Sequence, residues 1–253
     1  ASYTYALRYC MNNNAPYPLA LKPLDITSGA GKRLYDAIGE VTGYKILDLN
    51  QSKLNLMPIS AMYSASSCGV SSSNQFVYTA SNPYLQSVVS PFDTDFYIKK
   101  YGGDGLYGTV QVKFADLKAQ LERNLGSEVV FSGTGPYGSP LYATDYDGGE
   151  GRYVKYINAT YGSGVKIKGK AVRDAVNKLG ISMRSHAFAV EGYDADTDML
   201  TLKTMGHGHG LGMSQYGAVG LANEAGWNYQ QILKHYYSIT SDSSHQLVAP
   251  NWD

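Results

Sequence analysis

The chain has 253 residues, of which 43% are hydrophobic and 17% are charged, so it is long enough to form a sizeable core. Its 21 Lys and Arg residues balance its 21 Asp and Glu residues, and a neutral chain lacks the counterion-release drive that nucleic-acid binding uses. An aromatic content of 12% excludes disorder over most of the length, and no apolar run approaches the roughly 18 residues of a membrane span.

The first ten residues carry one face of a helix. Tyr3, Ala6, Leu7 and Cys10 are spaced i, i+3, i+4 and i+7, and no capping residue precedes them. We therefore expect the back half of a helix, in a chain that is processed or truncated ahead of its first residue. Residues 12–31 follow and are rich in Asn, Pro and Gly, which predicts a loop.

Two runs further along are expected to pair as a hairpin. Residues 44–49 and residues 58–66 have strand composition, the second with the alternation of a half-buried strand, and the polar turn 50–55 joins them. The overlapping run 64–73 consists mainly of Ser, Ala and Gly and has no core-forming content. Such a loop is either a flexible connector or a place where backbone approaches a ligand closely.

Four later segments carry helix signals. Residues 114–125 and 170–179 have apolar side chains at helical spacing, and a Gly at which a helix can end follows each of them. Residues 214–225 are predicted as a third helix. Asn228 is a suitable N-cap for a fourth, running to Tyr237.

The remaining segments predict strands. Residues 127–168 have the composition of strands and turns, and residues 183–191 and 199–205 flank a Gly- and Asp-rich turn that is typical of a hairpin. We expect an α+β fold with mixed or antiparallel sheets and several helices. Within a single domain, 1–253, a helix-plus-sheet lobe is predicted to be inserted around residues 109–181.

Tyrosine and glycine are unusually frequent, at 23 and 28 residues. Tyr is suited to sugar rings, because its face packs against C–H groups while its hydroxyl reaches polar edges. Abundant Tyr is equally typical of sheets with aromatic cross-strand pairs. The composition alone leaves both interpretations open.

The most unusual run is Gly-His-Gly-His-Gly-Leu-Gly-Met-Ser-Gln-Tyr-Gly at residues 206–217. Alternation at a period of two predicts an extended strand with His207 and His209 on one side and bare backbone between them. The Ser-Gln-Tyr that follows is expected to open a helix, whose N-terminal amides favour carbonyl or anionic oxygens. The run therefore predicts a polar surface for a neutral, hydroxyl-rich ligand.

Other interpretations of this run are weaker. A zinc site would need two more ligands, and His186, His235 and His245 are scattered along the chain. A serine hydrolase would need Gly-x-Ser-x-Gly, whereas Met and Gln flank Ser214. Tight packing of a glycine-rich strand on a helix accounts for the glycines alone.

The two cysteines, Cys10 and Cys68, have no CxxC spacing, so a zinc ribbon or a thioredoxin-type motif is excluded. They either pair in an oxidising compartment or are small buried hydrophobic residues. Low charge together with abundant Tyr, Asn, Ser and Gly suits an extracytoplasmic protein.

Taken together, these segments resemble one known family. The run 206–218, followed by Ala-Asn-Glu-Ala and Tyr-Gln-Gln-Ile-Leu-Lys-His-Tyr-Tyr, looks like the C-terminal signature of the stage II sporulation protein D (SpoIID/LytB-like) family. Further segments are similar to other motifs of that family in the same order, so the resemblance covers nearly the whole chain. These segments are residues 4–7, 62–69, 83–93 and 179–185.

The resemblance implies lytic cleavage of peptidoglycan between N-acetylmuramic acid and N-acetylglucosamine, leaving 1,6-anhydro ends, with a role in engulfment during sporulation. Such cleavage needs a carboxylic acid that protonates the leaving oxygen and that an apolar setting keeps protonated. One such group then takes the proton of the sugar's own C6 hydroxyl. The family's catalytic Glu lies upstream of residues 4–6, so we expect it ahead of Ala1 and assign no catalytic residue within the chain.

No other carboxylate is expected to substitute, because the contexts of Glu40, Glu150, Glu191 and Glu224 give no reason for desolvation. Family members that bind zinc do so with His and Cys after the first helix, and residues 12–31 contain neither, so we predict no metal and no other cofactor.

The expected partners are peptidoglycan glycan strands and other cell-wall hydrolases, outside the cytoplasm in the wall, secreted or membrane-anchored. The alternative function is a non-catalytic glycan-binding module that enhances another hydrolase. The Tyr-x-Lys pair Tyr97 and Lys99 either reaches the glycan or forms a solvated strand edge. The predicted substrate-binding residues are Tyr63, Ser64, Ser66, Cys68, Asp93, Tyr97, Lys99, His207, His209, Ser214, Gln215 and Tyr216.

Overall fold

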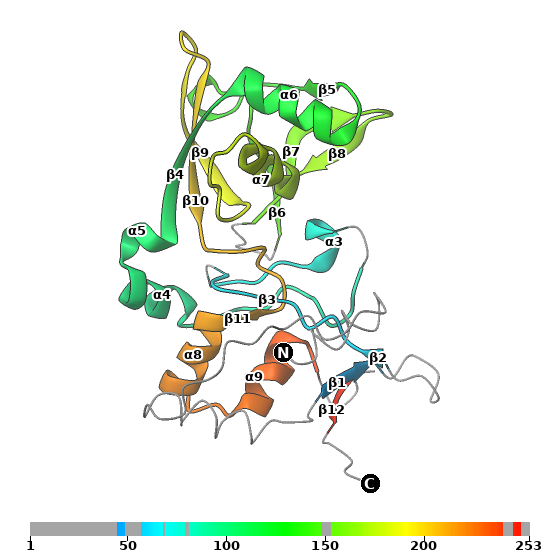
Figure 1. Ribbon diagram of the computed structural model, residues 1–253, viewed down its shortest axis with the longest axis vertical. Helices are drawn as coiled ribbons and strands as arrows, with labels where there is room; N and C mark the ends of the chain where they lie inside the picture. Colours follow the sequence, from blue (N-terminus) through cyan, green and yellow to red (C-terminus); the bar gives the residue numbers. More distant parts are fainter. Residues whose placement is uncertain are drawn as a thin grey trace.

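A computed structural model of the chain describes residues 45–48, 57–67, 69–78, 81–147, 153–239 and 245–248. The helix expected at the start of the chain, the loop 12–31 and both cysteines lie outside these residues. Figure 1 shows a sheet with helices α6 and α7 in the upper half and helices α8 and α9 in the lower half, with the short strands β3 and β11 between them. We call residues 107–205 the sheet region, and residues 57–106 and 206–239 the loop region.

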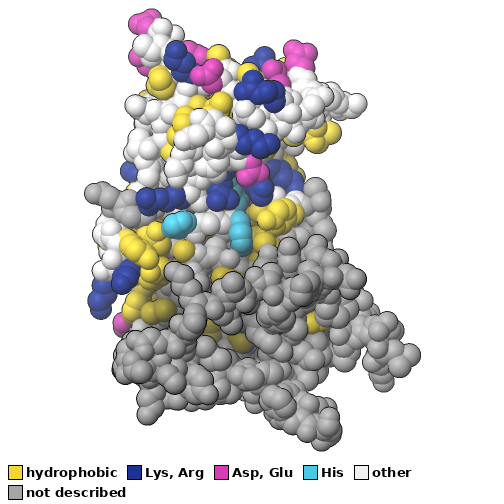
Figure 2. All heavy atoms as spheres, viewed as in Figure 1, with side chains coloured by type: hydrophobic (Ala, Val, Ile, Leu, Met, Phe, Trp, Pro, Cys, Tyr) yellow, Lys and Arg dark blue, Asp and Glu magenta, His cyan; other side chains and the backbone are white. Residues whose placement is uncertain are grey.

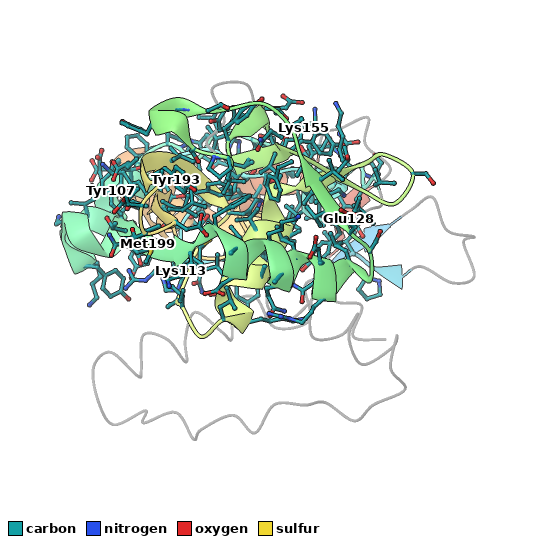
Figure 3. All side chains as sticks on the ribbon, turned by 90° about the horizontal axis from the view of Figure 1, so that it is seen from above. Tyr107, Lys113, Glu128, Lys155, Tyr193 and Met199 are labelled. Carbon is teal, nitrogen blue, oxygen red and sulfur yellow. The ribbon has the colours of Figure 1, made fainter. Side chains whose placement is uncertain are left out.

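The sheet region is built on one seven-stranded antiparallel sheet. Its main path runs β4-β10-β9-β7-β5, and β6 and β8 also pair with β7. Met199 pairs with Lys113 where β10 meets β4, and the two lie together in the view from above (Figure 3). The strands are β4 Tyr107–Lys113, β5 Val129–Phe131, β6 Ala143–Asp147, β7 Tyr153–Tyr161, β8 Val165–Lys168, β9 Ala187–Asp194 and β10 Met199–Met205.

Helix α6, Phe114–Leu125, has the bounds that the sequence predicted. Leu117 and Leu121 have no exposed surface, because the apolar stripe of the helix packs on the sheet. The helix ends at Gly126, whose φ of 65° is left-handed, and such a residue commonly follows a helix. At its start, the carbonyl of Asp198 in the predicted β9–β10 hairpin accepts from the Phe114 N–H at 2.9 Å. The hairpin prediction is confirmed, with strands that begin at Ala187 and end at Met205.

Helix α7, Gly169–Lys178, begins one residue before its predicted start. Val172, Ala175 and Val176 are fully buried against the same core as α6. The predicted inserted lobe, residues 109–181, falls within the sheet region. Its boundaries stay a prediction, because strands β9 and β10 continue the same sheet beyond them.

The loop region has a second, smaller core. Ile59, Leu85 and Leu221 pack with Tyr236 and Tyr237, which are completely buried. The N-cap predicted at Asn228 is confirmed: its side chain accepts from the Gln231 N–H at 3.0 Å, and the Gln231 side chain accepts in return. The helices are α3 Asn74–Val77, α4 Asp93–Tyr101, α5 Gly103–Leu106, α8 Gln215–Glu224 and α9 Tyr229–Tyr236.

The predicted hairpin near the start is confirmed only in its pairing. Strand β1, Lys45–Asp48, pairs antiparallel with the short strand β2, Met57–Pro58, and on its other side with β12, His245–Val248. The rest of the predicted second strand is not a continuous strand. Instead, β3, Tyr63–Ser64, pairs parallel with β11, Met213–Ser214. Strand β11 directly follows residues 206–212, which are described below.

Candidate functional site

The glycine–histidine segment, residues 206–212, does not form the predicted extended strand. Gly206, Gly208, Gly210 and Gly212 have φ values of 82°, 116°, 70° and 65°. These lie in the left-handed range that glycine adopts without steric cost, so the prediction was wrong in backbone conformation. The alternating glycines instead allow the backbone to pass very close to neighbouring residues. A Cβ at residue 208, for example, would lie 2.6 Å from the Cβ of Ser64.

Backbone hydrogen bonds hold this segment in place along its length. His207 and Ser66 exchange two bonds of 3.1 Å, and the Ser72 N–H donates to the Gly210 carbonyl at 2.8 Å. On the other side, the Gly208 N–H donates to the carbonyl of Arg184 at 3.0 Å. These bonds therefore attach the glycine–histidine segment both to residues 66–72 and to the turn that follows α7.

The serine loop, residues 64–73 apart from Cys68, is one of these neighbours. The connector interpretation was wrong, because Ser66, Ser67, Ser71 and Ser72 are at most 1% exposed. A buried carboxylate orders each half of the loop. Buried serine hydroxyls form hydrogen bonds, which explains why a run with few apolar side chains is still ordered.

Asp93 holds the first half of the serine loop. Its Oδ2 accepts from the Ser67 N–H at 2.7 Å and from the Ser67 hydroxyl at 2.6 Å, and the Ser90 hydroxyl lies at 3.3 Å. Asp93 itself has no exposed surface. The structure thus places this residue beneath the loop, and its predicted part in binding a glycan stays a prediction.

Asp147 holds the second half, and the sequence did not single it out. Its Oδ2 accepts from the Ser72 hydroxyl at 2.7 Å and the Ser73 N–H at 2.6 Å, and its Oδ1 lies 3.3 Å from the Ser73 hydroxyl. Asp147 lies at the end of β6, so this contact joins the sheet region to the loop region. No sequence signal marked it, because it stands in the polar run Asp-Tyr-Asp-Gly-Gly.

A cluster of aromatic rings lies beside the glycine–histidine segment. The Tyr97 ring is 4.9 Å from that of Tyr101 and 5.0 Å from that of Tyr216, and its hydroxyl lies 3.0 Å from Nδ1 of His207. The hydrogen bond with Tyr101, and then burial, raise the pKa of Tyr216 to about 12. Tyr216 is therefore uncharged at neutral pH.

The Tyr-x-Lys pair does not act as a unit. Tyr97 and Lys99 lie on helix α4, so the strand-edge interpretation was wrong, and residues two apart on a helix point to different sides. Tyr97 is 3% exposed and contacts the site, whereas Lys99 is exposed and lies over the Phe96 ring. Of the two residues, only Tyr97 therefore lies at the candidate site.

Ser214, Gln215 and Tyr216 begin helix α8 as predicted. The Ser214 hydroxyl accepts from the Gly217 N–H at 3.2 Å and caps the helix. The Tyr216 N–H donates to the carbonyl of Ala65 at 3.1 Å, while Gln215 is exposed. Tyr63 and Ser64 lie beside this helix start in the β3–β11 pair, and the Ser64 hydroxyl is buried without a hydrogen-bond partner among the described residues.

The histidines of the site are held in their neutral form. Burial, and then the positive charges of Arg173 and Lys170, lower the pKa of His209 to about 4. Its Nδ1 accepts from the Leu211 N–H at 3.0 Å, which places the proton of the neutral ring on Nε2. Burial, followed by Arg184 and Arg173, also lowers the pKa of His207. Both rings therefore offer hydrogen bonds rather than charge at pH 7.

His186 joins this group, although the sequence gave no reason to place it there. It is 1% exposed, its ring centroid lies 4.7 Å from that of Tyr153, and burial lowers its pKa to about 3. Figure 2 shows histidine side chains next to a band of Lys and Arg side chains on one face. The site thus combines neutral polar groups with nearby positive charge.

The described carboxylates include no evident catalytic acid. Glu191 forms an ion pair with Lys203 at 3.0 Å, and Glu224 is exposed at the end of α8. Glu40 and Glu150 lie outside the described residues, as does Cys68. Within the described part of the chain, no group of three or more His, Cys, Asp or Glu side chains is placed to bind a metal ion. That part also contains no helix long and apolar enough to cross a membrane.

Comparisons place this α+β protein among known relatives. No protein-family model matches the chain. Stage II sporulation protein D of Bacillus subtilis (strain 168) is 31% identical over 212 residues, which cover 84% of this chain and 51% of that protein. The Bacillus amyloliquefaciens protein of the same name is 31% identical over 206 residues, covering 81% and 49%.

A third relative shares a shorter stretch. The amidase enhancer of Bacillus subtilis (strain 168) is 52% identical over 50 residues, which cover 20% of this chain and 7% of that protein. The chain belongs to the stage II sporulation protein D family, as its motifs indicated. It spans about half the length of the two sporulation proteins that it matches.

Proposed function

We propose that this protein binds peptidoglycan glycan strands at the glycine–histidine segment and takes part in their lytic cleavage between N-acetylmuramic acid and N-acetylglucosamine, leaving 1,6-anhydro ends. The observation that carries the proposal is the set of neutral polar groups around His207 and His209, beside the ring cluster of Tyr97, Tyr101 and Tyr216. Amino sugars offer hydroxyl and amide groups for such donors and acceptors, and C–H faces for aromatic rings.

The chemistry sets a limit on which residues take part in cleavage. An acid must protonate the leaving glycosidic oxygen, and the oxocarbenium-like centre must then receive the C6 oxygen of the same sugar as its proton leaves. Asp93 and Asp147 are buried and accept hydrogen bonds from serines, so they support the site rather than reach a substrate. In this proposal the described residues bind and orient the strand, and the acid is the Glu that the family resemblance places ahead of Ala1.

A second function is supported by the match to the amidase enhancer. In that case the same surface binds glycan strands and recruits or enhances another wall hydrolase, without cleaving the strand itself. Either function places the protein outside the cytoplasm, at the cell wall.

The two functions are separated by the products. The full natural protein is incubated with purified sacculi, and the released material is analysed by mass spectrometry. We expect muropeptides with 1,6-anhydro ends. Strand binding without such products, together with faster release of peptides when an amidase is added, would leave only the enhancer function.

The location of the binding site has its own test. Gln215→Ala should weaken the binding of a chitooligosaccharide by about three- to tenfold, because one hydrogen bond contributes about 0.5–1.5 kcal/mol. Gln230→Ala is the matched control, since Gln230 is also exposed in the first turn of a helix but lies on α9. Equal affinities in the two variants and the parent protein would move the glycan site away from this segment.

A further inference from the structure

A groove rich in lysine adjoins the candidate site. It has a volume of about 380 Å³ and lies between the segment that follows the serine loop and the first turn of α7. Lys166, Lys168 and Lys170 line it, and Tyr78 and Tyr161 contribute aromatic surface. Asp174 is the single carboxylate among its lining residues, so the groove carries a net positive charge.

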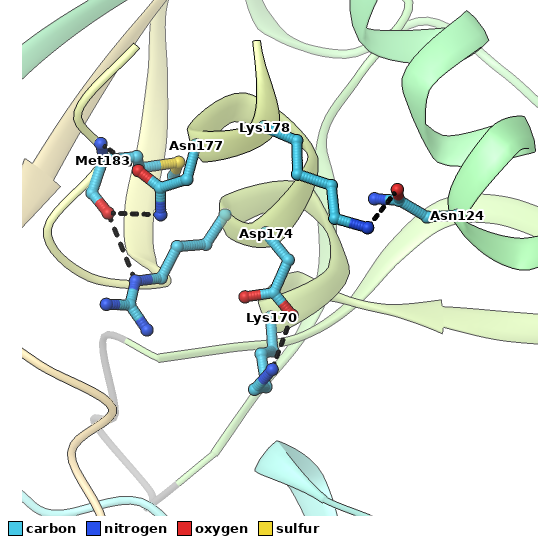
Figure 4. A network of polar contacts seen from close by, with 7 residues as sticks. Asn124, Lys170, Asp174, Asn177, Lys178 and Met183 are labelled. Atoms are coloured by element: carbon cyan, nitrogen blue, oxygen red, sulfur yellow. Dashed lines mark hydrogen bonds and ion pairs between the residues drawn. The ribbon is translucent and has the colours of Figure 1, made fainter. Parts of the chain in front are cut away.

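The lysines are held at the walls of the groove by specific contacts. The Lys168 ammonium donates to the carbonyls of Gln75 and Tyr78, which attaches β8 to the segment that follows the serine loop. The Lys170 ammonium pairs with Asp174 at 2.5 Å, as Figure 4 shows, and lies 5.4 Å from the centre of the Tyr78 ring. Lys166 is exposed, so its charge remains open to a ligand.

Helix α7 links the groove to the histidines, because, in addition to burial, its residues Arg173 and Lys170 both help to lower the pKa of His209. Arg173 lies one turn after Lys170 on α7, and residues three apart on a helix are neighbours. Its Nε donates to the Met183 carbonyl at 3.2 Å, and the next carbonyl, that of Arg184, accepts from the Gly208 N–H. Within the described part of the chain, Arg173 takes part in no ion pair. A line of positive charge thus runs from the groove to the glycine–histidine segment.

The positive charge of the groove indicates a negatively charged ligand group, because the chain as a whole is neutral. A ligand made only of neutral amino sugars has no group that would pair with these lysines. Muramic acid, in contrast, carries a lactyl group whose carboxyl is either free or joined to the peptide, and the peptide has carboxylates of its own. Lysine binds such groups as a flexible point charge.

We propose that the groove of Lys166, Lys168 and Lys170 binds a carboxylate of the wall glycan whose sugar rings lie at the glycine–histidine segment, an inference that rests on the function proposed above. The groove then sets the register of the strand: it selects which sugar ring lies next to it, because muramic acid alternates with a sugar that has no carboxylate.

The test compares three ligands by calorimetry at low salt. They are a peptide-free tetrasaccharide of alternating N-acetylglucosamine and N-acetylmuramic acid, its methyl ester, and the same tetrasaccharide with peptides attached. We expect the free acid to bind several-fold more tightly than the ester. If only the peptide-bearing ligand exceeds the ester, the peptide is the source of the carboxylate. Equal affinity of all three ligands would overturn the proposal.

Charge-removing variants locate the effect. In the Lys166→Gln/Lys168→Gln/Lys170→Gln variant, the preference for the acid over the ester should fall by roughly two- to fivefold for each charge removed. The single variant Lys166→Gln leaves the anchored Lys168 intact and should show one such step. The control Lys100→Gln/Lys113→Gln/Lys234→Gln removes three exposed lysines that do not line the groove and should keep the preference. An unchanged preference in the groove variants, or an equal loss in the control, would contradict the assignment.

The outcome can be separated from that of the proposed function. Neutral chitooligosaccharides should bind the groove variants as they bind the parent protein, and should lose affinity only in Gln215→Ala. If they bind normally but the carboxylate adds nothing, the groove inference fails alone. If no glycan binds at all, the proposed function fails first. Tighter binding of a glycerol-phosphate oligomer than of the free-acid tetrasaccharide, lost in the groove variants, would assign the groove to a phosphate polymer and overturn the inference.

Discussion

The sheet region and the loop region are ordered in different ways. In the sheet region, α6 and α7 bury apolar side chains such as Leu117 and Val172 against one sheet. In the loop region near the site, buried serines bind two carboxylates and a glycine-rich backbone. Apolar packing is non-directional and tolerates adjustment, whereas a buried polar network depends on specific hydrogen-bond partners. The order of the loop region therefore depends on particular polar side chains, whereas the order of the sheet region depends mainly on apolar packing.

The largest expected effect tests the sheet region. Leu121→Ala removes a fully buried side chain from α6 and should lower the free energy of unfolding by about 2–5 kcal/mol, because it leaves a cavity. Urea denaturation measures this change. The affinity of the folded protein for a chitooligosaccharide should stay the same, and a matching loss of affinity would show that the two regions are not independent.

The next effect tests the carboxylate that joins the regions. Asp147→Asn replaces one carboxylate oxygen with an NH2 group, which cannot accept from the serines, and removes the negative charge, so it should cost about 2–3 kcal/mol and weaken glycan binding as well. Asp145→Asn is the control on the same strand, because Asp145 is exposed, where it pairs with Lys155 and accepts from the Tyr146 N–H, so its loss should cost at most about 1 kcal/mol. Similar losses of stability in both variants would refute the role of Asp147.

An effect of similar size tests the glycine backbone. Gly208→Ala adds a Cβ that meets Ser64 at a φ of 116°, and should cost about 2–3 kcal/mol in unfolding free energy along with glycan affinity. Gly180→Ala has a similar positive φ, of 81°, but no atom within 4 Å of the added Cβ. It should cost only about 1 kcal/mol and leave binding unchanged. Thermal or urea unfolding of both variants shows whether the contact with Ser64 or the positive φ accounts for the loss of stability at residue 208.

The smallest effect concerns pH. The pKa of His186 is lowered to about 3, so between that value and about 6.5 the unfolded chain binds a proton that the folded protein does not. Stability should therefore fall as the pH falls through this window, by about 2 kcal/mol per such histidine between pH 7 and pH 5. His186→Gln should flatten the urea-denaturation profile measured across this range. A parent protein whose stability is constant from pH 7 to pH 5 would contradict the assignment.

Much of the sheet region could be predicted from the sequence. The periodicity of residues 114–125, the glycine after them and the Asp-rich turn before Met199 act locally, so they predicted α6 and the β9–β10 hairpin. The site was predicted in composition but not in conformation. His207, Ser214 and Tyr216 come together as expected, yet the glycines adopt positive φ rather than an extended strand.

What the amino-acid sequence determined by itself is therefore helices α6 to α9, the β9–β10 hairpin and the family, since these depend on spacing and on motifs that are contiguous in the chain. The tertiary structure alone decided that Asp147 holds Ser72 and Ser73, that His186 lies near His209, and that three lysines share one groove. Asp147 and its serines, and His186 and His209, come from distant parts of the chain, and the lysines face Tyr78 and Leu125, which are also distant in sequence. Only folding brings them together, and the burial and charge that define their chemistry do not exist before it.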